Sequence, residues 1–539
     1  MFCVSLSPIT LFMGLRGVIG GLAVLAASAL LTAGVQVGTA QAETALADEA
    51  FRAAQGVMLS SVGSAMDRAL AYKRDGSPEL ATLVRERDAA LAEGQRGART
   101  LASAEPGDRP ELARRLAETE RRLQAMEQAL MRDHAAYMAE TRPRTLGIAQ
   151  VQARLGAHDL LLLLLPDEDG AYIWAITSQQ VSWRHVPALA RDRLTQRNAA
   201  LHRAWRLEAV HDPQGDGARL SHGLYADIFG SVEALMGGKR RLLVAAVDEF
   251  VTVPYAALRA DDPALNGNPV WLLDRMAVEH LPSLAALDPA PRRDVASDGV
   301  LVAGFGAPVL SGAPGTAAVE PGELLRSGHA IHDPERLRAL PFLPGAQREL
   351  DALSRRFGER ALVLSGAAAT EPAVRAALQA HSPRYLLFAT HGLLPSRLPS
   401  GSEPGLVFTP PAGEPQGAGD DGYLSMSEIA RLPLSADLVV ITACDAWAGA
   451  SADGRALTGL ARGFFLAGAS SLVVTLWPIE DQAAALLSDA LFARISDLQP
   501  SEALRQAMLS VRDDPSGRFA HPRDWAPYML AGGRVAEAP

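Results

Sequence analysis

The chain has 539 residues, which is enough for two or three domains, and its 48% hydrophobic and 21% charged residues are typical of a globular protein. The formal net charge is −10 and no long basic run occurs, so the composition argues against a nucleic-acid partner. The sequence contains no Walker loop, HExxH motif or CxxC pair, and it therefore predicts neither a metal ion nor a cofactor.

Residues 1–42 have the features of an export signal. Arg16 is the only charged residue, residues 18–37 are mainly apolar, and Ala40-Gln41-Ala42 fits the small-x-small cleavage pattern. These features predict a signal peptide and a mature chain in the bacterial periplasm. Because an apolar run of about 20 residues is also close to the length that spans a bilayer, the alternative is an uncleaved anchor that associates the chain with the membrane, facing the periplasm.

Residues 43–145 are rich in the strong helix formers Ala, Leu, Arg and Glu. Turn signals at residues 75–78 and 105–108 divide the region into three helices. Apolar residues in the last of these recur at spacings of three and four, as in a coiled-coil seam: Leu112, Leu116, Leu123, Met126, Leu130 and Tyr137. We expect a helical hairpin or bundle. A dimer seam through residues 111–138, or packing against the next domain, are the alternatives.

The pattern changes to alternating strands and helices near residue 146, which predicts an α/β domain with a mostly parallel sheet. Short apolar runs predict strands at residues 160–165, 172–177, 180–186, 241–246, 300–304, 361–364, 385–390, 438–441 and 471–476. Helical patterns lie at about 189–208, 222–236, 372–380, 459–466 and 484–509. We expect residues 394–422, rich in Pro, Gly and Ser, to form a loop over the site, and residues 525–530 to form an edge strand.

Two reactive side chains directly follow predicted strands. His391 follows the strand at residues 385–390, and Cys444 lies just beyond the strand at residues 438–441. In parallel sheets, ligands and reactive groups collect beyond the carboxyl ends of the strands. The other cysteine of the chain, Cys3, lies in the predicted signal, so Cys444 is the lone thiol of the mature chain and a candidate nucleophile. The alternative is an inert buried cysteine that acts as a small apolar side chain.

A histidine beside a thiol can take its proton and create a thiolate nucleophile. Such a pair would hydrolyse peptide bonds, with Cys444 attacking the carbonyl carbon and His391 serving as general base and then general acid. We expect the backbone N–H groups of Gly392 and Cys444 to stabilise the oxyanion, since a glycine after the histidine lets the substrate carbonyl approach closely.

Three stretches of the sequence resemble the CHAT domain family, which groups with the caspases, separase and gingipains. They are YLLFATHG, LVVITACDAWAG and LARGFFLAGASSLVVTLWPIED. The resemblance covers most of residues 146–534 and implies a caspase-like three-layer α/β/α fold. It also implies a first lobe (residues 146–295) without a dyad and a second lobe (residues 296–535) that carries the dyad of His391 and Cys444. Their separation of 53 residues is similar to that in caspases, which is about 50.

The resemblance implies a cysteine endopeptidase that acts on peptide bonds of a partner protein, and the predicted export signal places it outside the cytoplasm. Asp445, Trp447 and Asp248 are candidates for the substrate pocket, where an acidic side chain would favour a basic residue before the scissile bond. The family commonly has Cys-x-Thr-Gly, whereas Asp445-Ala446-Trp447 follows the cysteine here. A bulky Trp447 would reshape this side of the site, and it motivates the alternative of a non-catalytic scaffold that binds a regulatory partner.

Overall fold

The computed structural model describes residues 36–58, 109–134, 145–207, 215–264, 268–288, 299–312, 333–393, 403–413, 419–442 and 458–533, with positions 80, 83, 84, 86, 87 and 90. Its strands are β1 (Asp159–Pro166), β2 (Ala171–Ile176), β3 (Val181–Val186), β4 (Arg241–Ala246), β5 (Ala277–His280), β6 (Val302–Pro308), β7 (Ala361–Gly366), β8 (Tyr385–Ala389), β9 (Gly392–Leu393), β10 (Gly405–Val407), β11 (Tyr423–Ser425), β12 (Leu438–Ile441), β13 (Ser471–Thr475) and β14 (Tyr528–Gly532).

The α-helices are α3 (Gln36–Met58), α6 (Arg109–Asp133), α8 (Ile148–Gln152), α9 (Arg191–Leu207), α10 (Asp216–Phe229), α11 (Leu272–Arg275), α13 (Pro334–Arg338), α14 (Pro344–Phe357), α15 (Glu371–Ala380), α16 (Met426–Ile429), α17 (Thr458–Ala467), α18 (Asp481–Phe492), α19 (Pro500–Arg512) and α20 (Pro522–Trp525). Short 3-10 helices include η2 (Pro187–Leu189), η3 (Glu233–Leu235), η4 (Asp248–Thr252), η5 (Tyr255–Ala257), η6 (Leu284–Leu287) and η7 (Gly358–Arg360).

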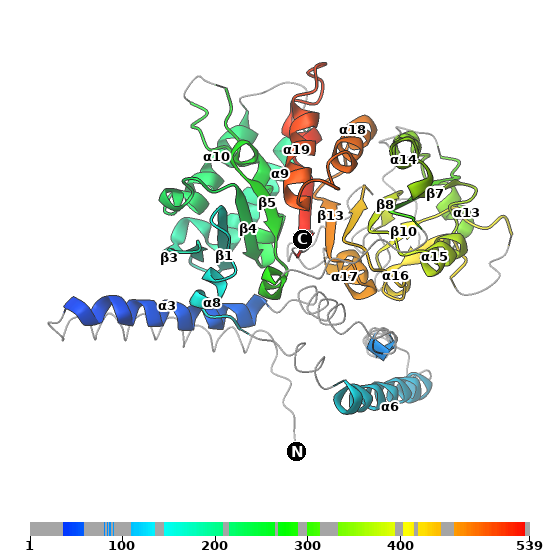
Figure 1. Ribbon diagram of the computed structural model, residues 1–539, viewed down its shortest axis with the longest axis horizontal. Coiled ribbons are helices and arrows are strands. Elements are labelled where there is room, and N and C mark those ends of the chain that lie inside the picture. The colour runs from blue at the N-terminus through cyan, green and yellow to red at the C-terminus, as the bar shows by residue number, and fades with distance from the viewer. Residues whose placement is uncertain are drawn as a thin grey trace.

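One 11-stranded sheet runs through both lobes in the order β3-β2-β1-β4-β5-β14-β13-β12-β8-β6-β7. The pairs β1–β2, β2–β3 and β13–β14 are antiparallel and the others are parallel, which confirms the mostly parallel sheet. In the second lobe, β7 lies on one side of β6, at the edge of the sheet. The later strands β8, β12 and β13 are added in turn on the other side of β6. Since crossovers between parallel strands are right-handed, α14 covers one face of the sheet and α15 and α17 cover the other. Figure 1 shows this α/β/α layering, with α14, α18 and α19 above the strands and α16 and α17 below them.

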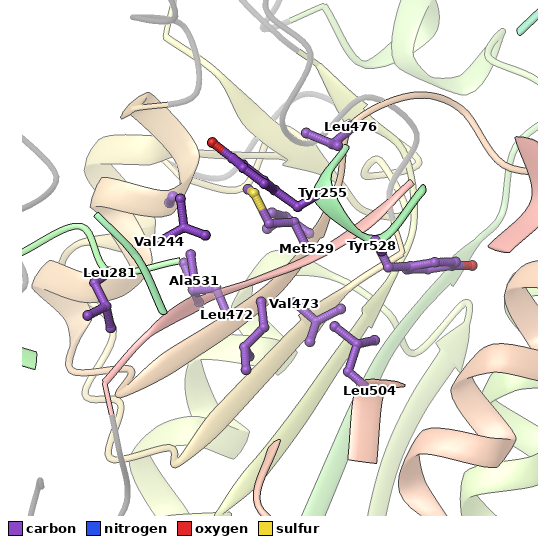
Figure 2. Close-up of a cluster of buried hydrophobic side chains, with 14 of the residues drawn as sticks. Val244, Tyr255, Leu281, Leu472, Val473, Leu476, Leu504, Tyr528, Met529 and Ala531 are labelled. Carbon is purple, nitrogen blue, oxygen red and sulfur yellow. The ribbon is translucent and has the colours of Figure 1, made fainter. Parts of the chain in front are cut away.

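Strand β14 joins the two lobes, so the expectation of an edge strand at residues 525–530 was wrong. It pairs with β5 of the first lobe on one side and with β13 on the other, and all five of its residues are buried. Side chains of both lobes meet around it (Figure 2), including Val244 and Leu281 from the first lobe and Leu472 from the second. The lobes therefore share one hydrophobic core.

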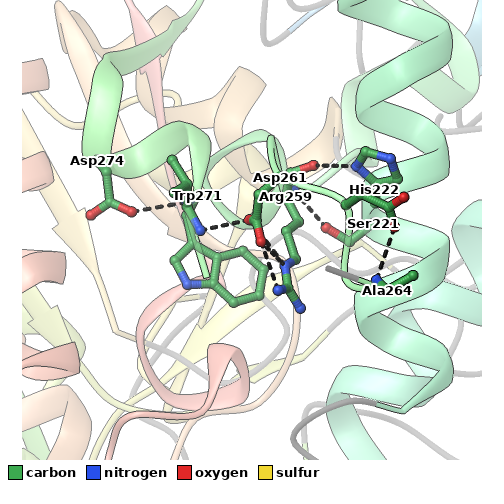
Figure 3. A network of polar contacts seen from close by, with 9 residues as sticks. Ser221, His222, Arg259, Asp261, Ala264, Trp271 and Asp274 are labelled. Carbon is green, nitrogen blue, oxygen red and sulfur yellow. Dashed lines mark hydrogen bonds and ion pairs between the residues drawn. The ribbon is translucent and has the colours of Figure 1, made fainter. Parts of the chain in front are cut away.

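A polar network anchors the segment between β4 and β5 on α10 (Figure 3). The Arg259 side chain, only 4% exposed, donates to Asp261 (Nη2 to Oδ2, 2.7 Å), and the Arg259 backbone N–H donates to the Ser221 hydroxyl oxygen at 2.8 Å. His222 Nδ1 donates to the Arg259 carbonyl at 3.2 Å. The same segment ends at Trp271, whose ring lies 5.6 Å from that of Trp525 in the second lobe. This network stabilises the first lobe and its contact with the second.

Helix α3 packs against the first lobe, in line with the alternative that the helical region packs on the next domain. Phe51 is fully buried, with its ring 6.1 Å from that of Trp174 on β2. The Gln55 amide exchanges two hydrogen bonds with the backbone of Leu146, and Asp48 accepts one from the Ile148 N–H at 2.6 Å. In the described residues, no helix is both long and apolar enough to cross a membrane, and most of the predicted signal lies outside them.

Helix α6 contacts a second helical segment of the region expected to form a hairpin or bundle. Leu130 and Thr119 are the buried residues of this helix, and Leu130 packs against Leu80 and Val84. Arg87 Nη2 lies 3.9 Å from Glu127 Oε1. The later residue of one segment thus faces the earlier residue of the other, which makes the two segments antiparallel.

Two local expectations differ from the structure. The helix expected at residues 222–236 runs instead from Asp216 to Phe229, and a 3-10 turn follows it. Its early start lies in a Gly- and Asp-containing stretch that resembles a loop, but Gly217 is needed there because a Cβ would lie 2.7 Å from the Trp205 ring.

The loop expected at 394–422 contains β10, which forms a small antiparallel sheet with β9 and β11. Residues 394–402 and 414–418 lie outside the described residues.

Candidate active site

His391 lies directly beyond the carboxyl end of β8 and is only 6% exposed. Its Nε2 lies 2.7 Å from the carbonyl oxygen of Pro341. Because a carbonyl can only accept, Nε2 carries the proton and Nδ1 carries the lone pair. Burial lowers the pKa of His391, outweighing the Pro341 hydrogen bond and the nearby Asp481 carboxylate, both of which raise it. The ring is therefore a neutral base at physiological pH.

The segment that supplies the Pro341 carbonyl is itself held by backbone pairing. The Gly312 N–H donates to the Leu340 carbonyl and the Phe342 N–H donates to the Gly312 carbonyl, both at 3.0 Å. A Cβ on Gly312 would lie 2.5 Å from the Ala339 carbonyl oxygen, so only glycine fits this approach. The histidine is thus oriented by a segment that is fixed in two places.

The strand before Cys444 runs beside the strand before His391 in a register that matches their spacing. Phe388 of β8 pairs with Ile441 of β12, and the Thr442 N–H donates to the Phe388 carbonyl at 3.1 Å. His391 and Cys444 each follow their paired residue by three positions. Cys444, Asp445 and Trp447 lie outside the described residues.

Gly392, the expected oxyanion donor, lies on β9 opposite Leu406 of β10. The Val407 N–H donates to the His391 carbonyl at 2.9 Å, which makes the neighbouring pair of Gly392 and Leu406 a non-hydrogen-bonded one. The Gly392 N–H therefore points away from β10.

Asp248, a candidate for the substrate pocket, does not lie near His391. It follows β4, which runs antiparallel to β8 and β12 because the chain direction reverses between β14 and β13. The carboxyl end of β4 therefore lies at the end of the sheet where β8 and β12 begin, opposite the end that carries His391. Several strands also separate β4 from β8. Asp248 has a left-handed φ of 50° and accepts from Arg191 at 2.7 Å. The structure gives it a local role at the start of η4, which sequence spacing could not distinguish from a pocket role.

A buried carboxyl that the sequence analysis did not single out lies next to the end of β12. Glu349 of α14 is 4% exposed and accepts from the Thr442 hydroxyl at 3.3 Å and from the Ser488 hydroxyl at 2.5 Å. Burial raises its pKa to about 7. A glutamate on the inward face of an amphipathic helix, between Ala346 and Leu350, was the available signal.

The described residues offer no metal site. They contain no cluster of three or more His, Cys, Asp or Glu side chains that could hold a metal ion. A cavity of about 20 Å³ between the lobes, beside Tyr255, His280 and Tyr528, has room for about one water molecule and is too small for a substrate.

A sequence model of the CHAT domain matches residues 218–533, more than half of the chain. The chain belongs to the CHAT domain family. The match contains the second half of the first lobe and almost all of the second lobe, including His391 and Cys444.

Two curated relatives resemble parts of this CHAT protein. Tetratricopeptide repeat protein 28 of Homo sapiens is 27% identical over 327 residues, which are 56% of this chain and 12% of the human protein. The protein of the same name from Mus musculus is 34% identical over 114 residues, 21% of this chain and 4% of the mouse protein. This CHAT protein therefore aligns with only a small part of each relative's length.

Two solved structures are among the matches to this chain. A Saccharomyces cerevisiae separase–securin complex aligns with 72% of this chain and 30% of the separase chain, at 9% identity and a TM-score of 0.44. The complex of Porphyromonas gingivalis RgpB pro- and mature domains aligns with 69% of this chain and 78% of that chain, at 8% identity and a TM-score of 0.33.

Proposed function

We propose that this CHAT protein is a cysteine endopeptidase in which His391 activates Cys444. The observation that carries the proposal is the buried His391 ring, whose Nε2–H is committed to the Pro341 carbonyl and whose Nδ1 is left as the basic nitrogen. A buried neutral imidazole with a fixed tautomer is what a general base requires. A second observation supports the pairing: β8 and β12 are in register at an offset of 53 residues, the same as the offset from His391 to Cys444.

In the proposed reaction, Nδ1 of His391 takes the thiol proton and the Cys444 sulfur bonds to the scissile carbonyl carbon. The carbonyl electrons move to the oxygen, where the N–H groups of Gly392 and Cys444 would stabilise the negative charge. The C–N bond then breaks as the imidazolium protonates the leaving amine. A water molecule next gives a proton to Nδ1 and attacks the thioester, and the thiol leaves with that proton.

The substrate is proposed to be a protein, with Asp445 and Trp447 lining the pocket for the residue before the scissile bond. Asp248 is not part of this proposal, because it lies at the end of the sheet opposite to the one that carries His391. The apolar segment at residues 18–37 supports export to the periplasm as a further part of the proposal, either as a cleaved signal or as an anchor.

The second candidate is a non-catalytic scaffold that binds a regulatory protein. The presence of Trp447, where the family commonly has a small Thr-Gly pair after the cysteine, favours it. In this case the histidine and its supporting hydrogen bonds would be structural.

Thiol reactivity separates the two candidates. In a Cys3→Ala background, Cys444 is the single thiol, and its alkylation by iodoacetamide can be followed across pH with and without His391→Ala. We expect fast alkylation near pH 7 that is lost in the variant, since a free thiol with a pKa of about 8.5 is mostly protonated there. His381→Ala is the matched control, because His381 lies at the far end of β8. Slow alkylation in all variants, rising only near pH 8.5, would contradict the dyad and favour the scaffold.

A further inference from the structure

Helix α14 is connected to both strand ends of the candidate active site. Its first residue, Pro344, follows Pro341 by three positions, and the Pro341 carbonyl orients His391. Further along the helix, Glu349 accepts a hydrogen bond from Thr442, two residues before Cys444. The segment just before α14 thus contacts the proposed base, His391. The side chain of Glu349 on the same helix contacts the strand that leads to the proposed nucleophile.

The position of α14 is itself fixed against α18. The Gly345 N–H donates to Asp481 Oδ2 at 3.1 Å, and a Cβ on Gly345 would lie 2.7 Å from Cβ of Asp481. At the other carboxylate oxygen of Glu349, Ser488 of α18 donates at 2.5 Å. Because α18 supports α14 at two points, movement of Glu349 relative to the sheet is restricted.

We propose that Glu349 is a positioning residue that holds the end of β12, through Thr442, at the distance from His391 that activation of Cys444 requires. This inference rests on the proposed dyad. Glu349 does not touch the reacting atoms. It acts through the Thr442 hydroxyl, and the backbone N–H of Thr442 donates to the Phe388 carbonyl of β8.

The chemical environment of Glu349 fits a positioning role. Its carboxyl is buried with two hydroxyl partners and no cation within hydrogen-bond reach among the described residues. Burying a carboxyl has a cost, and an apolar side chain would pack on the sheet without it. The carboxyl provides two hydrogen-bond oxygens at a point where α14, α18 and the end of β12 converge.

The test uses the full chain in the Cys3→Ala background, with Thr442→Val and Glu349→Gln as the variants. Valine keeps the shape of Thr442 and removes its hydroxyl, and glutamine keeps one carbonyl acceptor. Two quantities are measured: the alkylation rate of Cys444 across pH, and hydrogen exchange by mass spectrometry in the peptide that contains residues 438–444. Ser471→Ala is the matched control, because it removes a buried hydrogen bond to the Asp437 carbonyl at the opposite end of the same strand.

We expect Thr442→Val to slow alkylation at pH 7 about threefold to tenfold, the effect of losing one hydrogen bond. It should shift the apparent thiol pKa upwards and speed exchange at residues 438–444. Glu349→Gln should have a smaller effect on both, and Ser471→Ala should leave the alkylation profile unchanged while it lowers stability.

Unchanged alkylation and unchanged exchange in Thr442→Val and Glu349→Gln would overturn the inference. Failure of the proposed function is a separate result. If wild-type alkylation does not depend on His391, the dyad is wrong, and the exchange data still decide whether Glu349 holds the end of β12.

Discussion

Nε2 of His391 lies 2.7 Å from the carbonyl oxygen of Pro341, a residue 50 positions earlier in the chain. This contact fixes the tautomer of the ring and directs its basic nitrogen away from Pro341. Because the acceptor is a backbone atom, no side-chain substitution at Pro341 removes it directly. The backbone pairing that holds the Pro341 segment is therefore the place to test the contact.

The first prediction concerns Gly312, which pairs with the Pro341 segment. Gly312→Ala places a Cβ 2.5 Å from the Ala339 carbonyl oxygen, so the two segments must separate and the Pro341 carbonyl must shift. We expect alkylation of Cys444 at pH 7 to slow about tenfold or more, as for a misplaced catalytic group. Gly237→Ala, where nothing lies within 4 Å of the added Cβ, is the control and should have the wild-type rate. Equal rates in all three proteins would mean that the Pro341 contact is dispensable.

The second prediction tests the role of Asp248. Asp248→Asn removes its ion pair with Arg191, a partly exposed pair at 2.7 Å, and asparagine tolerates the left-handed φ of 50°. We expect a loss of about 0.5–1 kcal/mol in the free energy of unfolding and no change in Cys444 reactivity or substrate preference. Urea unfolding, the alkylation assay and cleavage of a peptide panel measure the three quantities. A change in preference at the residue before the scissile bond would restore Asp248 as a pocket residue.

The third prediction is a pH dependence of stability that arises from Glu349. Burial raises its pKa to about 7 in the folded protein, above the value of about 4.3 for a free glutamate. Between these values the folded state binds the extra proton, so this contribution to stability is fully present below about pH 4 and is lost as the pH rises through about 7. Glu349→Gln removes the titration. We therefore expect the free energy of unfolding of the wild type, relative to the variant, to fall by up to about 3 kcal/mol between pH 4 and pH 8.

Urea unfolding at several pH values measures this difference. Glu359→Gln, at an exposed position just beyond the same helix, is the control and should follow the wild-type curve. A constant difference between the wild type and Glu349→Gln across this range would show that Glu349 ionises normally and that its environment is more polar than the structure indicates.

The fourth prediction concerns helix α3. Phe51 is fully buried against Trp174 of the first lobe, so Phe51→Ala should lower the free energy of unfolding by about 3–5 kcal/mol. Met131→Ala on α6, at a side chain that is 55% exposed, should change it by less than about 0.5 kcal/mol. A loss below about 1 kcal/mol for Phe51→Ala would mean that α3 does not belong to the folded core of the first lobe.

Local sequence patterns predicted most of the individual elements. The helix expected at about residues 372–380 forms as α15, and the Thr370 hydroxyl caps it by accepting from the Ala373 N–H. The apolar runs before His391 and Cys444 became the neighbouring strands β8 and β12. Such features depend on side chains a few residues apart, and the sequence displays them directly.

The candidate site was predicted only in part. The sequence indicated His391 at a strand end, but its partner Pro341 lies in a loop without a distinctive motif, and a backbone acceptor leaves no signal in side-chain identity. Asp248 followed a buried strand just as His391 did. The sequence could not show that the two strands run in opposite directions, because that depends on the pairing of β14 with β13.

The sequence by itself determined the α/β class, the mostly parallel sheet and the residue types of the proposed dyad, because each of these follows from local periodicity or from a strand and its next few residues. Only the tertiary structure decided that β14 lies between the lobes, that α3 packs on the first lobe, and that α14 and the segment just before it contact both strand ends of the site. These features depend on contacts between segments that are far apart in the chain. Several alternative pairings would bury the same apolar faces, and the competition among them is resolved only when the whole core is packed.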